Sequence, residues 1–319
     1  MNAAAAPRIN AKKIISEYSL ILVFIVIFII CSFVTGFRFS SVNNIMVILL
    51  STSSIGMISL GMTFVITSGG IDLSSGPVMA AVGTVLIMLQ SSGAVPIGVS
   101  IAACCLLATL IGFINGIIIT KAKLPPFIVT LAIGIIARSL AMFSVKGATI
   151  RGNAVPEFTS IGNGTVGVLP VPFLIVLASV IILGIFLHKT KFGSYVYAVG
   201  GNEKAAIYSG IKADRIKIMT YMLIGLCVGM AAMIETSRMA AIAPSTSGHL
   251  YEFEAITAVI VGGTALSGGK GNIVGTVIGF LILGVVTNMM LMMNISPYLN
   301  GALKGAVILI AVLLQNKNN

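Results

Sequence analysis

Residues 20–31 read LILVFIVIFIIC, an apolar run without a single charged side chain. Similar runs recur along the whole 319-residue chain, in which 57% of the residues are hydrophobic and only 8% are charged. Soluble domains are typically about 45–50% apolar and about 25% charged. Together with a mean hydropathy of +1.10, this composition argues against a soluble globular protein, and the low charge argues against a disordered chain.

The apolar runs predict an all-α integral membrane protein with about ten transmembrane helices. A helix needs about 20 predominantly apolar residues to cross a bilayer, and the gaps between the runs hold polar residues, Gly and Pro. The predicted spans cover residues 19–35, 44–67, 77–91, 96–119, 127–144, 172–188, 217–235, 254–267, 273–292 and 298–314.

The positions of the basic residues predict the orientation. With the N-terminus in the cytoplasm, thirteen of the nineteen Lys and Arg residues fall in cytoplasmic loops and four in outer loops, which is the bias that cytoplasmic loops show. We therefore expect a multi-pass membrane protein with both termini in the cytoplasm. Residues 1–18 are expected to form a cytoplasmic tail and residues 19–316 a single transmembrane domain. The run 20–31 is interpreted as a retained span, because no small-residue cleavage site follows it.

Several other functions are disfavoured. The net charge of +11 does not indicate a nucleic-acid partner, because the basic residues lie between apolar runs instead of on one face with aromatic residues. The chain has no GxxxxGK[ST] phosphate loop and no cluster of His or carboxylates. We therefore expect that it is not an enzyme and binds no cofactor itself. The cysteines lie in apolar runs without metal-ligand spacing and are expected to be buried thiols. They are Cys31, Cys104, Cys105 and Cys227.

The longest predicted cytoplasmic segment, residues 188–217, contains six Lys and Arg residues. Asn202 is suited to cap a helix that continues through Glu203, and Gly210 is suited to end it. One or two short helices below the membrane are expected. They provide a docking surface for a partner, with an ordinary basic loop as the alternative interpretation.

Two glycine-rich segments resemble each other. Residues 69–76 read GGIDLSSG and residues 262–269 read GGTALSGG, and both lie between apolar runs. Interrupted hydrophobic segments at corresponding places mark transport sites in many membrane proteins, and broken backbone at membrane depth survives only inside protein or beside a cavity. A duplicated unit is predicted to line or gate a pathway. The span count gives both copies one orientation, whereas a different count would make them an inverted repeat, so the symmetry stays open. Its candidate residues are Gly69, Gly70, Asp72, Ser74, Gly262, Gly263, Thr264 and Ser267.

Polar residues near the apolar runs permit more than one interpretation. Asp72 either lines a pathway or caps the helix that begins near Ser74, close to the inner surface. His249, Tyr251, Glu252 and Glu254 are candidates for an outer entrance that faces a partner protein, although solvated loop charges are the simpler interpretation.

Four further charged residues are expected to have structural roles. Glu235 and Arg238 are three residues apart and are predicted to pair near the outer surface. Arg138 and Lys304 are predicted to form pairs, to extend to the membrane interface or to cap carbonyl groups.

Four segments, in this order, resemble the ribose/monosaccharide permease family of bacterial ABC importers. They are 61–76 (GMTFVITSGGIDLSSG), 124–132 (LPPFIVTLA), 200–211 (GGNEKAAIYSGI) and 251–271 (YEFEAITAVIVGGTALSGGKG), and the resemblance covers roughly residues 14–316. It implies an ABC importer permease fold, located in the bacterial inner membrane, that translocates a ribose-like monosaccharide.

The resemblance also implies partners: a second permease subunit, usually an identical one, a cytoplasmic ATPase with two nucleotide-binding halves that binds ATP and Mg²⁺, and a soluble sugar-binding protein. It assigns the segment within 188–217 to coupling with that ATPase. The coupling residues are Gly201, Asn202, Glu203, Ala205, Ala206, Ser209 and Gly210.

The sequence departs from the family pattern at Ser75, where Val is common, and at Ala265, where Ser is common. Two rival transport functions stay open at this point. A branched-chain amino acid ABC permease would have a related fold, and an ion-coupled carrier would need a titratable relay in the membrane, for which Asp72 is the candidate.

Overall fold

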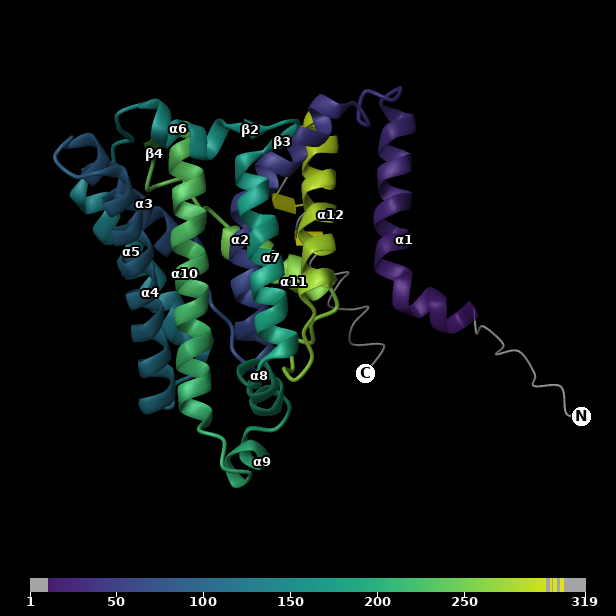
Figure 1. Ribbon diagram of the computed structural model, residues 1–319, viewed down its shortest axis with the longest axis vertical. Helices are drawn as coiled ribbons and strands as arrows, with labels where there is room; N and C mark the ends of the chain where they lie inside the picture. The colour runs from purple at the N-terminus through teal and green to yellow at the C-terminus, as the bar shows by residue number, and fades with distance from the viewer. Residues whose placement is uncertain (1–10, 297–298, 300, 303–304, 307–319) are drawn as a thin grey trace, which may run out of the picture.

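The computed structural model describes residues 11–296, 299, 301–302 and 305–306, with side chains from residue 20 onward (Figure 1). The chain is mostly helical. Its helices are α1 (Ala11–Val34), α2 (Val42–Thr67), α3 (Ser75–Ser91), α4 (Ile97–Lys121), α5 (Pro126–Ser144), α6 (Pro156–Asn163), α7 (Val171–Lys189), α8 (Lys191–Gly201), α9 (Glu203–Tyr208), α10 (Ala213–Met239), α11 (Tyr251–Val261) and α12 (Ile273–Met292).

Short strands join some of the loops in two antiparallel pairs. β1 (Ile150–Arg151) pairs with β4 (Ala241–Ile242), with Ile150 opposite Ile242. β2 (Thr165–Val166) and β3 (Leu169–Pro170) form a hairpin.

In the described part of the chain, six helices are long and apolar enough to cross a membrane: α2, α4, α5, α7, α10 and α12. Each coincides with a predicted span. Residues 20–34 of α1 and the whole of α3 are shorter apolar helices. The predicted count of about ten transmembrane helices is therefore not confirmed.

The prediction of a crossing helix at 254–267 is wrong. α11 has only 11 residues, so at a rise of 1.5 Å per residue it is about 16 Å long, roughly half of the ~30 Å apolar core of a bilayer. The tenth predicted span, 298–314, falls largely outside the described residues. The predicted tail, 1–18, includes the beginning of α1 at Ala11.

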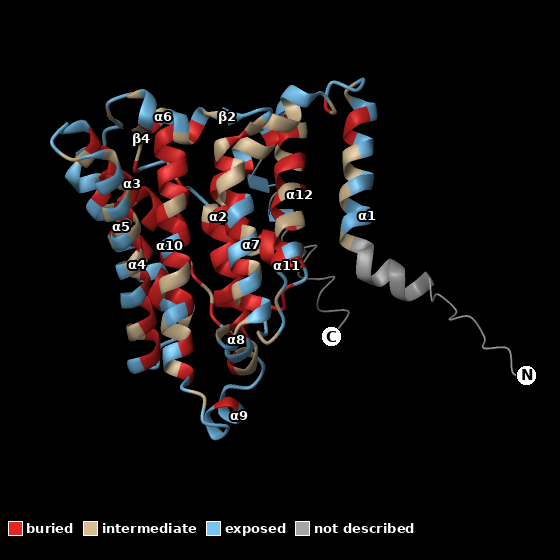
Figure 2. Cartoon of the chain, viewed as in Figure 1, coloured by how far each residue is buried: buried red, intermediate tan, exposed pale blue. Residues whose placement is uncertain are grey.

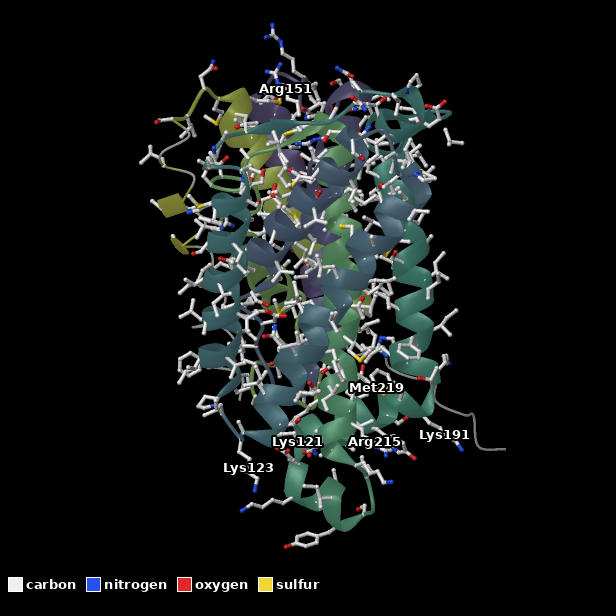
Figure 3. The ribbon with its side chains drawn as sticks, turned by 90° about the vertical axis from the view of Figure 1, so that its left-hand side faces the viewer. Lys121, Lys123, Arg151, Lys191, Arg215 and Met219 are labelled. Carbon is white, nitrogen blue, oxygen red and sulfur yellow. The ribbon has the colours of Figure 1, made fainter. Side chains whose placement is uncertain are left out.

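The long helices stand side by side, which gives the bundle two distinct ends (Figure 1). The end that carries α8 and α9 also carries Lys121, Lys123, Lys191 and Arg215 (Figure 3). We call it the α9 end. The opposite end carries α6, the short strands and Arg151 (Figures 1 and 3), and we call it the α6 end. Basic side chains thus gather at the end where the sequence predicts a cytoplasmic segment.

Burial divides the spans into a centre and a periphery (Figure 2). In the most apolar stretches of α2, α10 and α12, 61–67% of the residues are buried, against 22–28% in α4, α5 and α7. The exposed side chains of the outer helices are large and apolar, for example Leu106, Ile135 and Ile182. These outer faces have the composition expected of surfaces in contact with lipid.

Glycine brings α4 and α10 close together. Gly112 and Gly116 of α4 are four residues apart, as are Gly225 and Gly229 of α10, and all four face the other helix. A Cβ atom on Gly229 would lie 2.6 Å from the Cα of Cys105, a distance that real side chains do not tolerate. Small residues at this spacing allow transmembrane helices to pack backbone against backbone.

Candidate transport pathway and coupling segment

α2 and α11 end in the same way, and both endings lie in the two glycine-rich segments. A glycine in the left-handed region follows the last turn of each helix, Gly69 at φ +84° and Gly263 at φ +86°. The next N–H, that of Gly70 or Thr264, donates to the carbonyl five residues earlier, at 2.9 and 3.1 Å, which is the Schellman pattern. The sequence repeat pairs Gly69 with Gly262, so the structural correspondence is shifted by one residue.

The two breaks touch each other at the α9 end. The N–H of Gly269 donates to the carbonyl of Thr67 at 2.9 Å, and a Cβ atom on Gly268 would lie 3.1 Å from the Cα of Gly69. Gly200 of α8 lies in the same contact, because a Cβ atom there would be 2.7 Å from the nitrogen of Gly269. α2 and α11 both run towards this end (Figure 1), so the two segments do share one orientation.

After the first break the chain re-enters the bundle, and Asp72 and Ser74 are both only 2% exposed. One carboxylate oxygen of Asp72 accepts hydrogen bonds from the backbone N–H of Ser74 at 2.7 Å and from its hydroxyl at 2.6 Å. Asn115 of α4 donates to the Ser74 hydroxyl at 3.0 Å. Asp72 therefore stabilises the turn that leads into α3, in the interior and not at a surface. It bonds to Ser74, the residue before the helix, and not to an N–H of the first turn of α3, so it is not the helix cap.

Two side chains from other helices hold the backbone of this re-entrant segment. The Tyr221 hydroxyl of α10 donates to the carbonyl of Ile71 at 3.1 Å, and the Thr130 hydroxyl of α5 accepts from the N–H of Leu73 at 3.0 Å. Neither residue was predicted from the sequence, because neither lies near the segment in the chain.

The second break stays at the α9 end. Thr264 is fully buried and its hydroxyl accepts from the N–H of Asn272 at 3.3 Å, whereas Ser267 is exposed. Asn272 caps α12 by accepting from the N–H of Gly275 at 3.2 Å. The hydroxyl of Tyr197 in α8 donates to the carbonyl of Gly271 at 2.8 Å.

The segment 188–217 forms two short helices, α8 and α9, as predicted. The Asn202 side chain accepts from the N–H of Ala205 at 3.0 Å, and Gly210 ends the segment with φ +82°. Gly201, Glu203, Ser209 and most of α9 are exposed, while Ala206 is buried at 4%. Tyr208 is 90% exposed, so this aromatic side chain is almost unpacked.

The first turns of α10 connect α9 to the first break. The Lys217 ammonium forms a salt bridge with Glu203 at 2.6 Å, one turn before Tyr221. Between them, the Thr220 hydroxyl lies 3.3 Å from the hydroxyl of Ser68. The salt bridge is partly solvated, so it contributes little stability, but it fixes the position of α9 relative to α10.

The expectation of solvated charges at an outer entrance is wrong for two of its residues. Glu252 and Glu254 are each only 8% exposed, because α11 begins inside the bundle. Tyr251 is half-buried, and His249 is exposed. Among these four, only His249 has the exposure that contact with a soluble partner requires.

The remaining charged residues divide into a confirmed and a corrected prediction. Arg138 caps carbonyl groups, donating to those of Pro244 and Ser247 at 2.6 and 3.1 Å. Glu235 does not form the predicted pair with Arg238: in the part of the chain that the structure describes, the two salt bridges are Lys121–Asp214 and Lys217–Glu203. Lys304 lies outside the described residues.

The described residues hold no group of three or more His, Cys, Asp or Glu placed to bind a metal ion.

A family model described as "Branched-chain amino acid transport system / permease component" matches residues 44–312. The chain belongs to this permease family. It is therefore a multi-pass membrane protein and a transport component. No solved structure matches the chain.

Three curated relatives of the chain are named for the import of sugars. The ribose import permease protein RbsC of Bacillus subtilis is 42% identical over 285 residues, which cover 86% of this chain and 85% of the relative. The protein of the same name from Escherichia coli K12 is 38% identical, with 88% of each chain covered. The L-arabinose transport system permease protein AraH of Escherichia coli K12 is 38% identical over 304 residues, which cover 95% of this chain and 91% of the relative.

Proposed function

We propose that this chain is the membrane-spanning permease subunit of an ATP-driven importer of a monosaccharide such as ribose. The observation that carries the proposal is similarity over almost the whole chain to permeases named for ribose and L-arabinose import. The family description names branched-chain amino acids, but the relatives quoted above are named for pentoses, so an amino acid importer is not favoured.

The proposed orientation, in the bacterial inner membrane, places the α9 end in the cytoplasm. The basic side chains at this end support it, because cytoplasmic loops are rich in Lys and Arg. In this orientation α1 begins on the cytoplasmic side (Figure 1). The α6 end, with exposed His249 on the loop that leads from it to α11, then faces the soluble sugar-binding protein.

α9 is the proposed contact with the ATPase, which carries two nucleotide-binding halves and itself binds ATP and Mg²⁺. Its support is an exposed, capped helix with a projecting Tyr208. The permease is proposed to act as a pair of identical subunits, and the exposed apolar faces of its outer helices contact lipid or the second copy.

Motion of α9 reaches the first glycine break through α10. Lys217 connects to α9, and Thr220 and Tyr221 connect to residues 68–71. Because these three residues lie within about one helical turn, a displacement of α9 is transmitted to the re-entrant segment over a short, rigid path.

The test is purification of the tagged chain in mild detergent, with identification of co-purifying proteins by mass spectrometry. We expect a stoichiometric ATPase that is lost in the Glu203→Arg variant and retained in the Glu157→Arg variant. Glu157 is the matched control because it is an exposed glutamate in the first turn of α6, at the other end of the bundle. Purification of the chain without any ATPase would contradict the proposal.

A further inference from the structure

Two cavities lie on either side of Tyr251, in the half of the bundle nearer the α6 end. The first has a volume of about 230 Å³ and lies between the end of α10, β4 and the loop that leads to α11. The second has a volume of about 200 Å³ and lies between α2, α11 and α12. Tyr251 lines both of them.

A buried carboxylate lines the first cavity. Glu235 is only 8% exposed, and it accepts hydrogen bonds from the hydroxyl of Ser54 at 3.1 Å and, at 3.5 Å, from that of Tyr251. It forms no salt bridge with any described residue. An ionisable group at membrane depth is costly and usually faces a cavity or a substrate pathway, which is where Glu235 lies.

Charges of both signs and several hydroxyl groups surround the second cavity. Glu254, which is 8% exposed, lines it together with Arg238. The hydroxyl-bearing residues of its wall, besides Tyr251, are Ser51, Thr52 and Thr287.

This lining selects a class of ligand. Carboxylates accept hydrogen bonds from hydroxyl groups, Arg238 donates them, and Ser and Thr do both. An anionic ligand would face the two carboxylates, and the hydroxyl groups of the walls suit a ligand that both donates and accepts hydrogen bonds. Each cavity is smaller than the roughly 300–1,000 Å³ of pockets for drug-sized ligands, which suits a small, uncharged, polyhydroxylated molecule.

We propose that the two cavities are the halves of one binding site for an uncharged monosaccharide, with Glu235 binding its hydroxyl groups and Tyr251 dividing the halves. The inference rests on the proposed function and adds to it: the permease itself recognises the sugar, in addition to the soluble binding protein.

The test measures protection of a cysteine by sugar in the complex of permease and ATPase. Thr287→Cys places a thiol in the second cavity, and its modification by a thiol reagent is followed at that position by mass spectrometry with and without D-ribose. We expect D-ribose to slow the modification. Glu235→Gln is expected to raise the D-ribose concentration that gives half-protection by roughly tenfold. The amide oxygen still accepts a hydrogen bond, but a bond to a neutral group is weaker than one to a charged group. Glu157→Gln, with the same chemical change, is expected to leave protection unchanged.

A second reporter keeps the test informative if Glu235→Gln fails to fold. Thr246→Cys places a thiol in the first cavity. Because the two cavities form one site, D-ribose should protect both thiols with the same half-protecting concentration. Protection of one thiol alone, or of neither, would overturn the inference.

The outcomes for the two proposals differ. ATP-driven uptake by the wild type without protection of either thiol would contradict the binding site and leave the importer function intact. Protection of both thiols without ATP-driven uptake would support the site and contradict the importer function. Equal protection in Glu235→Gln and the wild type would remove Glu235 from the site.

Discussion

The two glycine breaks begin alike and continue differently. α2 and α11 both end in a left-handed glycine with the same backbone hydrogen bonds. After α2 the chain turns back into the bundle and is held by Tyr221 and Thr130 from two other helices. After α11 it stays at the α9 end and is held by local bonds and by Tyr197.

The comparison separates what local sequence determines from what distant contacts determine. A helix commonly ends at a glycine in the left-handed conformation, because glycine adopts positive φ without a steric penalty. This ending depends only on the local sequence. The direction of the chain after the break depends on which side chains satisfy its backbone groups. We therefore propose that the re-entrant segment, which is held from α10, is the one that responds to α9.

Gly200→Ala is expected to have the largest effect, because it disturbs the contact between both breaks. The added Cβ would lie 2.7 Å from the nitrogen of Gly269, and overpacking of this kind typically costs about 1–3 kcal/mol. We expect a lower melting temperature in detergent and loss of transport. Gly184→Ala in α7 is the control, since its Cβ would meet only one atom, at 3.9 Å. Equal melting temperatures of the two variants would show that the breaks do not depend on this contact.

Tyr221→Phe and Tyr197→Phe each remove one tyrosine hydroxyl group, the first from the first break and the second from the second break. The two variants therefore allow a direct comparison of the breaks. Tyr221 is 1% exposed, so its replacement removes an interior donor to the partly buried carbonyl of Ile71, at a net cost of about 0.5–1.5 kcal/mol. Tyr197 is half-buried at the α9 end, where water can replace it. We expect the first variant to lose most uptake while retaining the ATPase, and the second to keep most of its uptake. A larger loss in Tyr197→Phe would assign the responsive break to α11.

Thr130→Val and Thr264→Val form a smaller comparison of the same kind. Thr130 Oγ1 accepts from the N–H of Leu73 at 3.0 Å, and Thr264 Oγ1 accepts from that of Asn272 at 3.3 Å. The net loss is about 0.5–1.5 kcal/mol for an ordinary hydrogen bond, with the greater change expected for Thr130. Thermal unfolding in detergent measures the difference, and a greater destabilisation by Thr264→Val would reverse the ranking.

The apolar runs predicted most of the fold because the signal for a membrane helix is local. Six predicted spans coincide with helices of sufficient length, and Asn202 and Gly210 marked α9 through capping preferences that depend on only a few neighbouring residues. The span at 254–267 was wrong because hydropathy does not detect a helix that begins inside the bundle.

The candidate site was predicted only in part, for the same physical reason. The sequence located Asp72 and the glycines, but it placed Glu252 and Glu254 at a solvated surface because acidic residues ordinarily mark loops. Tyr221 is 150 residues from the backbone group that it holds. No local pattern identifies such a contact, and only the packing of α10 against the break reveals it.

We propose that ATP hydrolysis by a partner drives sugar import through α9, and uptake by proteoliposomes is the decisive measurement. The wild-type permease is reconstituted with its ATPase and binding protein and supplied with radiolabelled D-ribose and ATP. We predict uptake that requires all three proteins and ATP, and that falls to background in Glu203→Arg although this variant still inserts in the membrane. Uptake at the wild-type level in Glu203→Arg, or uptake by the permease alone in an ion gradient, would contradict the account.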